Sequence, residues 1–207
     1  TMSNAGIEFD FGYRDTYGDF NWHISANATY NKNSLTYLGD DATDLYGSSH
    51  KIGQLTRGEI GLPFPFFYGY KTDGVFASAK DAKEAGLYIM AENGKDKIPF
   101  EAGDMRFVDN GDKEINEEDR TIIGDPNPDF YGNIFTSLAY KRLKLNVRFN
   151  YSVGNDVYNY MRAQLEGGNR FMNQTTAMVN RWQVEGQQAS MPRATFQDPM
   201  GNSRFSD

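Results

Sequence analysis

Apolar and polar residues alternate near the beginning of the chain. In residues 6–15 every second residue is apolar or aromatic, and the same pattern returns in residues 20–31 after the turn 16–19. A period of two is typical of strands with one apolar and one polar face, and two such runs joined by a short turn indicate a hairpin. Each run is about as long as the 9–11 residues of a transmembrane strand. The sequence therefore predicts an antiparallel hairpin here.

The same alternation occurs again in residues 133–140 and 143–153, which Lys141 and Arg142 connect. The apolar positions of the second run are Leu143, Leu145, Val147, Phe149, Tyr151 and Val153. In a soluble sandwich this apolar face would pack against a second sheet, and in a barrel it would contact lipid. Periodicity alone does not separate the two, although soluble sheets are the commoner case.

Between the two hairpins lies an insertion, residues 33–130, that is too long for a connector without structure of its own. We expect it to carry a small fold. Short helices are expected at residues 78–86, 156–166 and 174–185. The first is the best defined, because Ser78 can cap its beginning and Gly86 can end it.

Composition agrees with short strands and long loops. Of 207 residues, 39% are hydrophobic and 21 are glycine. The chain has no cysteine, which excludes disulfides and zinc sites built from thiolates. Its net charge of −7 argues against a nucleic-acid partner. No run of about 18 apolar residues could form a transmembrane helix, but transmembrane strands would escape this test because they alternate.

An acidic loop is the candidate metal site. Asp109, Asn110, Asp112 and Asp119 could bring together the oxygen ligands that Ca²⁺ prefers. The spacing is imperfect, because Lys113 occupies the place where a calcium-binding loop needs glycine for its sharp turn. The alternative, which the spacing favours, is a solvated acidic turn that orders the loop.

Phe67, Tyr68 and Tyr70 belong to an aromatic stretch of the insertion. Exposed rings could stack on a sugar or hold a peptide. Large rings more often form the core of a small loop domain, so both interpretations stay open here and the core is favoured.

The stretch 103–133 carries a resemblance to a known family. The matching residues, at fixed spacing, are Gly103, Asp104, Asp112, Ile115, Asp119, Arg120, Ile123, Gly124, Pro126, Pro128 and Phe130. This pattern resembles a signature of the SusC/RagA family of TonB-linked outer-membrane proteins. Residues 4–8, 67–76, 154–159 and 202–207 are also similar to segments of that family, in the family's order.

The resemblance implies an all-β fold with short helices, an antiparallel transmembrane β-barrel fragment made of hairpins. Residues 1–32 and 131–154 would be barrel hairpins. Residues 33–130 would be a long extracellular loop insertion, and residues 155–207 a helical and irregular extracellular loop. The family's N-terminal plug, its TonB-contacting segment and its closing strands have no counterpart, so we expect an excerpt from the C-terminal part of a longer protein.

The resemblance also implies a function. Members of the family import oligosaccharides or peptides across the outer membrane of Gram-negative cells, together with a SusD-like surface lipoprotein and with energy from TonB. The polar strand faces would line the lumen and the apolar faces would contact membrane lipid. No catalytic residues and no cofactor other than Ca²⁺ are expected. The alternative is a soluble, β-rich, carbohydrate-binding module at the cell surface, steadied by calcium; a hydrolase with unrecognised carboxylates is a third and weaker reading.

Overall fold

The computed structural model describes residues 1–39, 44–47, 49–50, 53–196 and 198–204. The chain forms two compact units, which we call the sheet unit and the loop unit. The sheet unit consists of Thr1–Gly47, Thr56–Phe67 and Gly124–Val157. The loop unit consists of Ser48–Leu55, Tyr68–Ile123 and Tyr158–Asp207. The insertion 33–130 is thus divided between both units: residues 33–47, 56–67 and 124–130 belong to the sheet unit and the rest to the loop unit.

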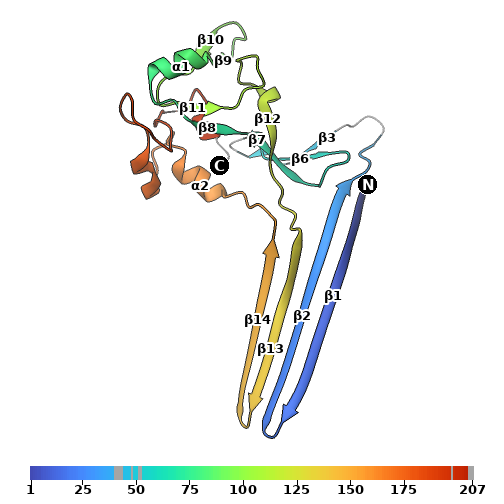
Figure 1. Cartoon of the computed structure of the whole chain (residues 1–207). Helices are drawn as coiled ribbons and strands as arrows, with labels where there is room; N and C mark the ends of the chain where they lie inside the picture. The colour runs from blue at the N-terminus through green and yellow to red at the C-terminus, as the bar shows by residue number, and fades with distance from the viewer. Residues whose placement is uncertain (40–43, 48, 51–52, 197, 205–207) are drawn as a thin grey trace. The chain divides into compact units, whose positions relative to one another are not determined.

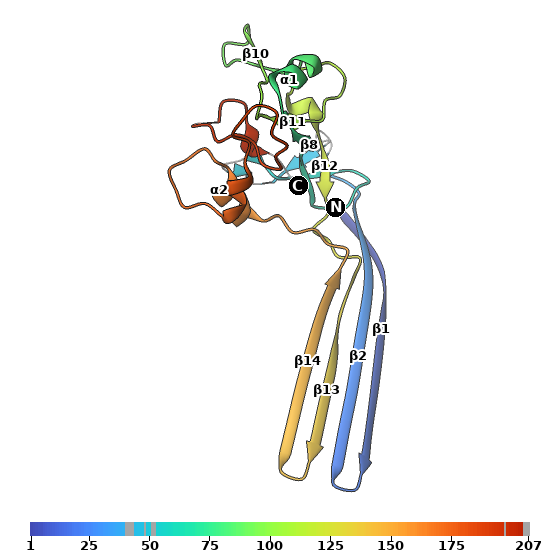
Figure 2. The same cartoon turned by 60° about the vertical axis from the view of Figure 1, so that its left-hand side comes forward.

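The sheet unit is built on four long antiparallel strands. They are β1 (Met2–Tyr17), β2 (Phe20–Leu35), β13 (Phe130–Tyr140) and β14 (Leu143–Val153), in the order β1-β2-β13-β14. Figures 1 and 2 show them side by side from two directions. Both predicted hairpins are confirmed, and β14 has the predicted bounds. The other three strands extend beyond the predicted ranges, because backbone pairing continues to Met2 and Tyr17 in β1, to Leu35 in β2 and back to Phe130 in β13.

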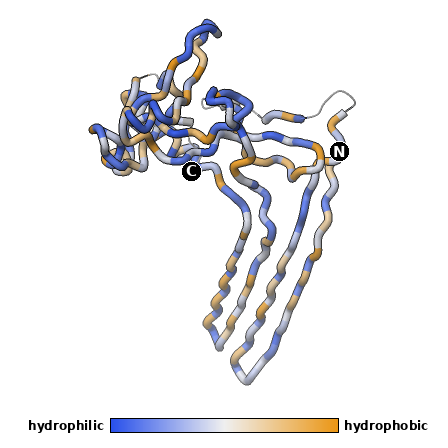
Figure 3. Tube along the Cα trace, turned by 45° about the horizontal axis from the view of Figure 1, so that its top comes forward, coloured by the Kyte–Doolittle hydropathy of each residue, from blue (hydrophilic) through white to orange (hydrophobic). Residues whose placement is uncertain are grey.

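The register gathers the regularly alternating apolar positions of these strands on one face, whereas Phe135 lies on the other. Phe11 lies opposite Ala26, which lies opposite Ile134, which in turn lies opposite Phe149. The neighbouring row on the other face contains Asp10, Asn27, Asn133 and Asn150. Figure 3 shows the resulting alternation of hydropathy along the strands. We call these surfaces the apolar face and the polar face.

Tyr151 bridges three strands on the apolar face. Its hydroxyl donates to the backbone carbonyl of Asn27, at 3.0 Å, across Gly132 of the intervening strand. A Cβ on Gly132 would lie 2.1 Å from the Asn27 oxygen and 2.7 Å from the Tyr151 hydroxyl. Glycine at this position therefore makes room for both.

Beyond the long strands, the sheet unit contains a small pairing of short strands. β3 (Asp44–Tyr46) pairs with β6 (Thr56–Glu59), and Thr56 and Arg57 pair with Phe67 and Phe66 at the start of β7 (Phe66–Tyr70).

The side chain of Asn33, near the end of β2, holds the Pro-containing segments to the sheet unit. Its amide donates to the carbonyl of Phe64 and to the side chain of Asn127, and its oxygen accepts from the Phe64 N–H. Asn127 lies between the two prolines of the signature, so this rigid stretch is fixed where β13 begins.

The loop unit contains short strands and helices. They are β4 (Ser49–His50), β5 (Gly53–Gln54), β8 (Thr72–Val75), α1 (Ala79–Ala85), β9 (Tyr88–Met90), β10 (Lys97–Pro99), β11 (Met105–Phe107), η1 (Glu117–Asp119), α2 (Tyr160–Glu166), η2 (Thr176–Asn180) and η3 (Asn202–Arg204). β12 (Arg120–Gly124) continues from η1. The core consists of Tyr70, Phe76, Ala82, Leu87, Phe100, Met105, Phe107, Ile115 and Met200. Residues from widely separated parts of the sequence therefore form one apolar centre.

The structure agrees with some of the predicted helices and differs from others. At α1 the prediction is confirmed: the Ser78 hydroxyl accepts from the Asp81 N–H, and Gly86 ends the helix in the left-handed conformation at φ 66°. The helix expected at 156–166 begins later, at Tyr160. No helix of the described residues is long and apolar enough to cross a bilayer.

The prediction of a helix at residues 174–185 is wrong. Only Thr176–Asn180 are helical, as a 3-10 helix. Beyond it, the Trp182 N–H donates to the carbonyl of Met191, and the indole N–H donates to the carbonyl of Ala77. These tertiary hydrogen bonds hold the backbone in an extended path and override the local helical preference.

Candidate functional site

The signature residue Asp104 lies at the centre of a buried polar network in the loop unit. Its carboxylate is fully buried and accepts hydrogen bonds from the Glu101 N–H, from the guanidinium of Arg193 and from the side-chain amide of Asn202. The oxygen of the Asn202 side chain accepts in turn from the Met105 N–H at 2.8 Å. A buried carboxylate is stable only when its oxygens are satisfied in this way.

Arg193 supplies the positive charge of this network. Burial lowers the pKa of its guanidinium, but the charge and hydrogen bonds of Asp104, followed by those of Glu101, outweigh that effect and raise the pKa above its ordinary value. The side chain therefore stays charged.

Gly103, which precedes the buried aspartate, has φ 84° and packs against Trp182 and Arg193. A Cβ there would lie 2.4 Å from the indole. Both the conformation and the close contact explain why the signature begins with glycine.

The acidic loop brings its predicted residues together. Carboxylate oxygens of Asp109, Asp112 and Asp119 all lie within 4.8 Å of one another. Asn110 lies in the same turn, where its side-chain oxygen accepts from the Asp112 N–H. Three carboxylates at this separation are a donor set of the kind that a hard cation binds.

Much of the capacity of these oxygens is already used by the backbone. The two oxygens of Asp119 accept from the N–H groups of Asn110 and Asn116, at 2.9 and 2.8 Å. Asp109 accepts from the Lys113 N–H, and Asp112 from the Glu114 N–H. Lys113 adopts a left-handed conformation, φ 69°, where a calcium-binding loop would have glycine. The loop thus has an internal source of order, and metal binding stays a prediction.

Arg120, the next signature residue, anchors the end of this loop. Its side chain is only 8% exposed. It donates to the Glu117 carboxylate and to the backbone carbonyls of Gln54 and Tyr68, and its guanidinium lies 4.8 Å from the centre of the Tyr68 ring. This combination fixes the start of β12.

The predicted contact residues differ in exposure. Phe67 and Tyr68 are half-buried, and the Tyr68 ring faces Arg120. Tyr70 is buried in the core against Phe107, with ring centres 5.6 Å apart. Tyr70 thus has the packing role that sequence statistics favour, whereas ligand contact by Phe67 or Tyr68 stays a prediction.

Sequence reasoning missed Arg193 and Trp182, and it recognised Asn202 only as part of a similar tail. Residues 205–207 of that tail lie outside the described residues. No local pattern identifies these partners, because they lie about 80 to 98 residues beyond Gly103 and Asp104. The only usable signal was the fixed Gly-Asp pair itself.

Comparison with known proteins relates the chain to one group. No protein-family profile matches it. It is 32% identical over 209 residues to TonB-dependent receptor P3 of Formosa agariphila, a match that covers 99% of this chain and 20% of that protein. It is 27% identical over 161 residues to TonB-dependent receptor SusC of Bacteroides thetaiotaomicron, covering 76% of this chain and 14% of SusC.

Among solved structures, the chain resembles the RagAB peptide transporter, with a TM-score of 0.66 and 22% identity over 93% of this chain and 20% of that one. At 22% identity, the similarity to the RagAB peptide transporter shows a shared fold and nothing more. The chain spans about a fifth of the length of the curated relative P3. None of these relatives is named as an enzyme, which agrees with the expectation from the sequence. The curated relatives identify the chain as a homologue of part of the TonB-dependent receptors of the SusC/RagA family.

Proposed function

We propose that the sheet unit forms part of the wall of an outer-membrane β-barrel, and that the protein takes up a nutrient, an oligosaccharide or a peptide, in a TonB-dependent manner. One observation carries this proposal: the apolar face is continuous across four strands and stays exposed within the described residues.

The apolar face is larger than the apolar surfaces that soluble proteins usually expose to water. Ile7, Leu143 and Phe149 are 74%, 77% and 71% exposed. Soluble monomers rarely expose contiguous apolar patches larger than a few hundred Å². Strands of outer-membrane barrels have this alternation, with apolar side chains toward lipid and polar ones toward the lumen. Leu145 and Val147, which a soluble sandwich would bury, are also exposed.

The connections support an orientation. The register puts the two short turns, at Gly18 and at Lys141, at one end of the sheet. The long segments 36–129 and 154–207 both leave from the other end. In outer-membrane barrels the short turns are periplasmic and the long loops extracellular, so the loop unit would lie outside the cell.

The loop unit would then meet the substrate or a SusD-like surface lipoprotein. This partner is suggested by the names of the relatives, SusC and the RagAB transporter. TonB would act through parts of the protein other than this chain. The acidic loop would have a structural role, with its order provided by the hydrogen bonds to Asp109, Asp112 and Asp119.

Site-specific labelling of the full-length protein in lipid bilayers tests the proposal. Phe149→Cys and Asn150→Cys are adjacent on β14 but lie on opposite faces. Each variant is labelled with a polarity-sensitive fluorophore in a cysteine-free background. We expect a blue-shifted emission and quenching by lipid-soluble quenchers at position 149, and quenching by water-soluble iodide at position 150. Equal quenching by iodide at both positions would refute the proposal that the sheet unit is part of a barrel wall, and it would favour a soluble module.

A further inference from the structure

The charges on the polar face are separated along the strands. Glu8 and Asp10 lie on β1 toward the end with the long connections. Four basic side chains lie nearer the short turns: Arg14, His23, Lys144 and Arg148. The register puts Arg14 and His23 in one row of the sheet, Arg148 in the row before it and Lys144 in the row after it.

Three of them, Arg14, His23 and Lys144, border a hollow of about 430 Å³. Its lining includes Arg14, Asn21, His23, Phe135, Ser137, Lys144 and Asn146. The residues come from all four long strands, so the hollow exists only because the two hairpins are neighbours. We call it the basic cradle. Its volume lies within the range of small-molecule sites, roughly 300 to 1,000 Å³.

Phe135 organises the wall of the cradle. Its ring centre lies 5.5 Å from the guanidinium carbon of Arg148 and 5.9 Å from the His23 ring. A guanidinium held against an aromatic face keeps its hydrogen-bond donors available. Phe135, itself part of the lining, therefore holds Arg148 beside the hollow and provides a large apolar surface there.

The positive charge of the cradle is not neutralised within the described part of the chain. There, Arg14, Lys144 and Arg148 have no carboxylate partner within 4.0 Å, and the ion pairs involve other side chains. Arg14 and Lys144 at the hollow and Arg148 beside it repel each other, and an anion bound near them would relieve this repulsion. On most exposed surfaces, by contrast, charges of both signs are interspersed.

We infer that the basic cradle binds an anionic group, a carboxylate or a sulfate ester, of the imported solute. The inference rests on the proposed function, because the polar face borders the solute's path only if the apolar face contacts lipid. Arginine binds a carboxylate or sulfate through two parallel hydrogen bonds, and lysine adds a point charge. The Phe135 ring would pack against a sugar ring or an aliphatic side chain next to the anionic group.

Binding of matched solute pairs to the full-length transporter in lipid nanodiscs tests this inference. One pair is a sulfated hexasaccharide and its desulfated counterpart; the other is an octapeptide rich in glutamate and the same peptide with glutamine. We expect one anionic member to bind at least tenfold more tightly than its neutral counterpart. The pair that shows the difference identifies the source of the anion.

In the variant Arg14→Gln/Lys144→Gln/Arg148→Gln this preference should fall by about tenfold or more, because three ion pairs are lost. The charge-retaining variant Arg14→Lys/Lys144→Arg/Arg148→Lys should keep most of it. Glu8→Gln/Asp10→Asn, on the same face outside the cradle, should not weaken it. Equal abundance of all variants in the outer membrane shows that assembly is intact.

The inference is overturned if the wild type does not prefer either anionic member, or if the triple glutamine variant keeps the full preference. TonB-dependent uptake of the neutral members would leave the proposed function standing in both cases. The proposed function would be contradicted if wild-type cells took up none of the four solutes faster than cells without TonB. In that case the binding comparison would still show whether the basic cradle binds an anionic group.

Discussion

The carboxylate of Asp104 accepts a hydrogen bond of 2.8 Å from the side-chain amide of Asn202, and both side chains are at most 1% exposed. The two residues are 98 positions apart in the sequence. Asn202 also accepts from the Met105 N–H, so it satisfies a backbone donor and a carboxylate at once. This pair fastens the last described segment of the chain to the core of the loop unit.

Replacing Asp104 by asparagine should destabilise the loop unit. The guanidinium of Arg193, which is 27% exposed, would lose its principal charged partner at the fully buried position 104, at a cost of about 3 kcal/mol. In hydrogen-exchange measurements on the full-length protein, the Met105 amide should exchange about a hundredfold faster.

Glu101→Gln is the matched control, since Glu101 also pairs with Arg193 but is largely exposed. Its effect should stay below about 1 kcal/mol. Similar exchange rates in the two variants would mean that the buried charge of Asp104 stabilises the loop unit no more than the exposed charge of Glu101 does.

Asp119→Asn should loosen the acidic loop. Asp119 accepts two backbone N–H groups, and an amide offers only one oxygen and turns an NH₂ toward the other donor. We expect exchange at the Asn110 or Asn116 amide to rise by an amount equivalent to about 1–3 kcal/mol. Asp112→Asn should have little effect, because one oxygen is enough to accept from the Glu114 N–H. Unchanged protection in Asp119→Asn would contradict the role given to this side chain.

Calcium should add little to the order of this loop. Because the backbone already occupies both oxygens of Asp119, exchange in residues 109–119 should be the same in about 1 mM Ca²⁺ and in chelator. Strong protection by Ca²⁺ that disappears in Asp112→Asn would instead establish a metal site formed by Asp109, Asp112 and Asp119.

Gly132→Ala should impair assembly of the sheet. The new methyl group would collide with the Asn27 carbonyl and the Tyr151 hydroxyl, and overpacking costs at least about 1–3 kcal/mol. The folded fraction in outer membranes can be measured from heat-dependent mobility on gels. Gly12→Ala is the control, since its Cβ would meet nothing within 4 Å. An equal folded fraction for the two variants would argue against the close approach seen at Gly132.

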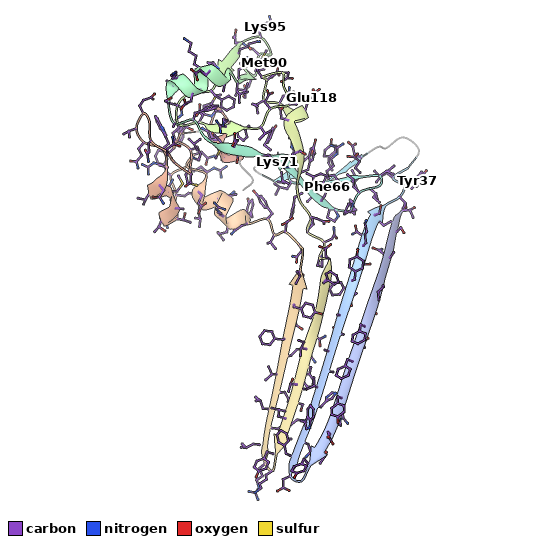
Figure 4. All side chains as sticks on the ribbon, viewed as in Figure 1. Tyr37, Phe66, Lys71, Met90, Lys95 and Glu118 are labelled. Atoms are coloured by element: carbon purple, nitrogen blue, oxygen red, sulfur yellow. The ribbon has the colours of Figure 1, made fainter. Side chains whose placement is uncertain are left out.

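A short epitope inserted after Gly94, beside Lys95 in the turn between β9 and β10, should bind antibody on intact cells (Figure 4). Gly94 and Lys95 are exposed and lie outside the core, so the insertion should be tolerated. An epitope inserted between Lys141 and Arg142 should bind antibody only after the outer membrane is permeabilised. The opposite result would reverse the proposed orientation.

The two hairpins, the composition of their faces and helix α1 follow from local patterns in the sequence. Alternation between apolar and polar residues is a local property, because successive side chains of a strand point to opposite faces. Ser78 and Gly86 likewise act on the helix ends beside them. The gathering of Asp109, Asp112 and Asp119 was predicted for the same reason, since they belong to one loop.

Three other features became known only from the folded chain: β2 and β13 are neighbours, Asp104 pairs with Arg193 and Asn202, and most of the helix expected at 174–185 is absent. These outcomes depend on contacts between residues far apart in the chain, and no local pattern specifies which distant partner satisfies a buried carboxylate or a strand edge. The basic cradle belongs to this second group, because its charged side chains come together only when the two hairpins form one sheet.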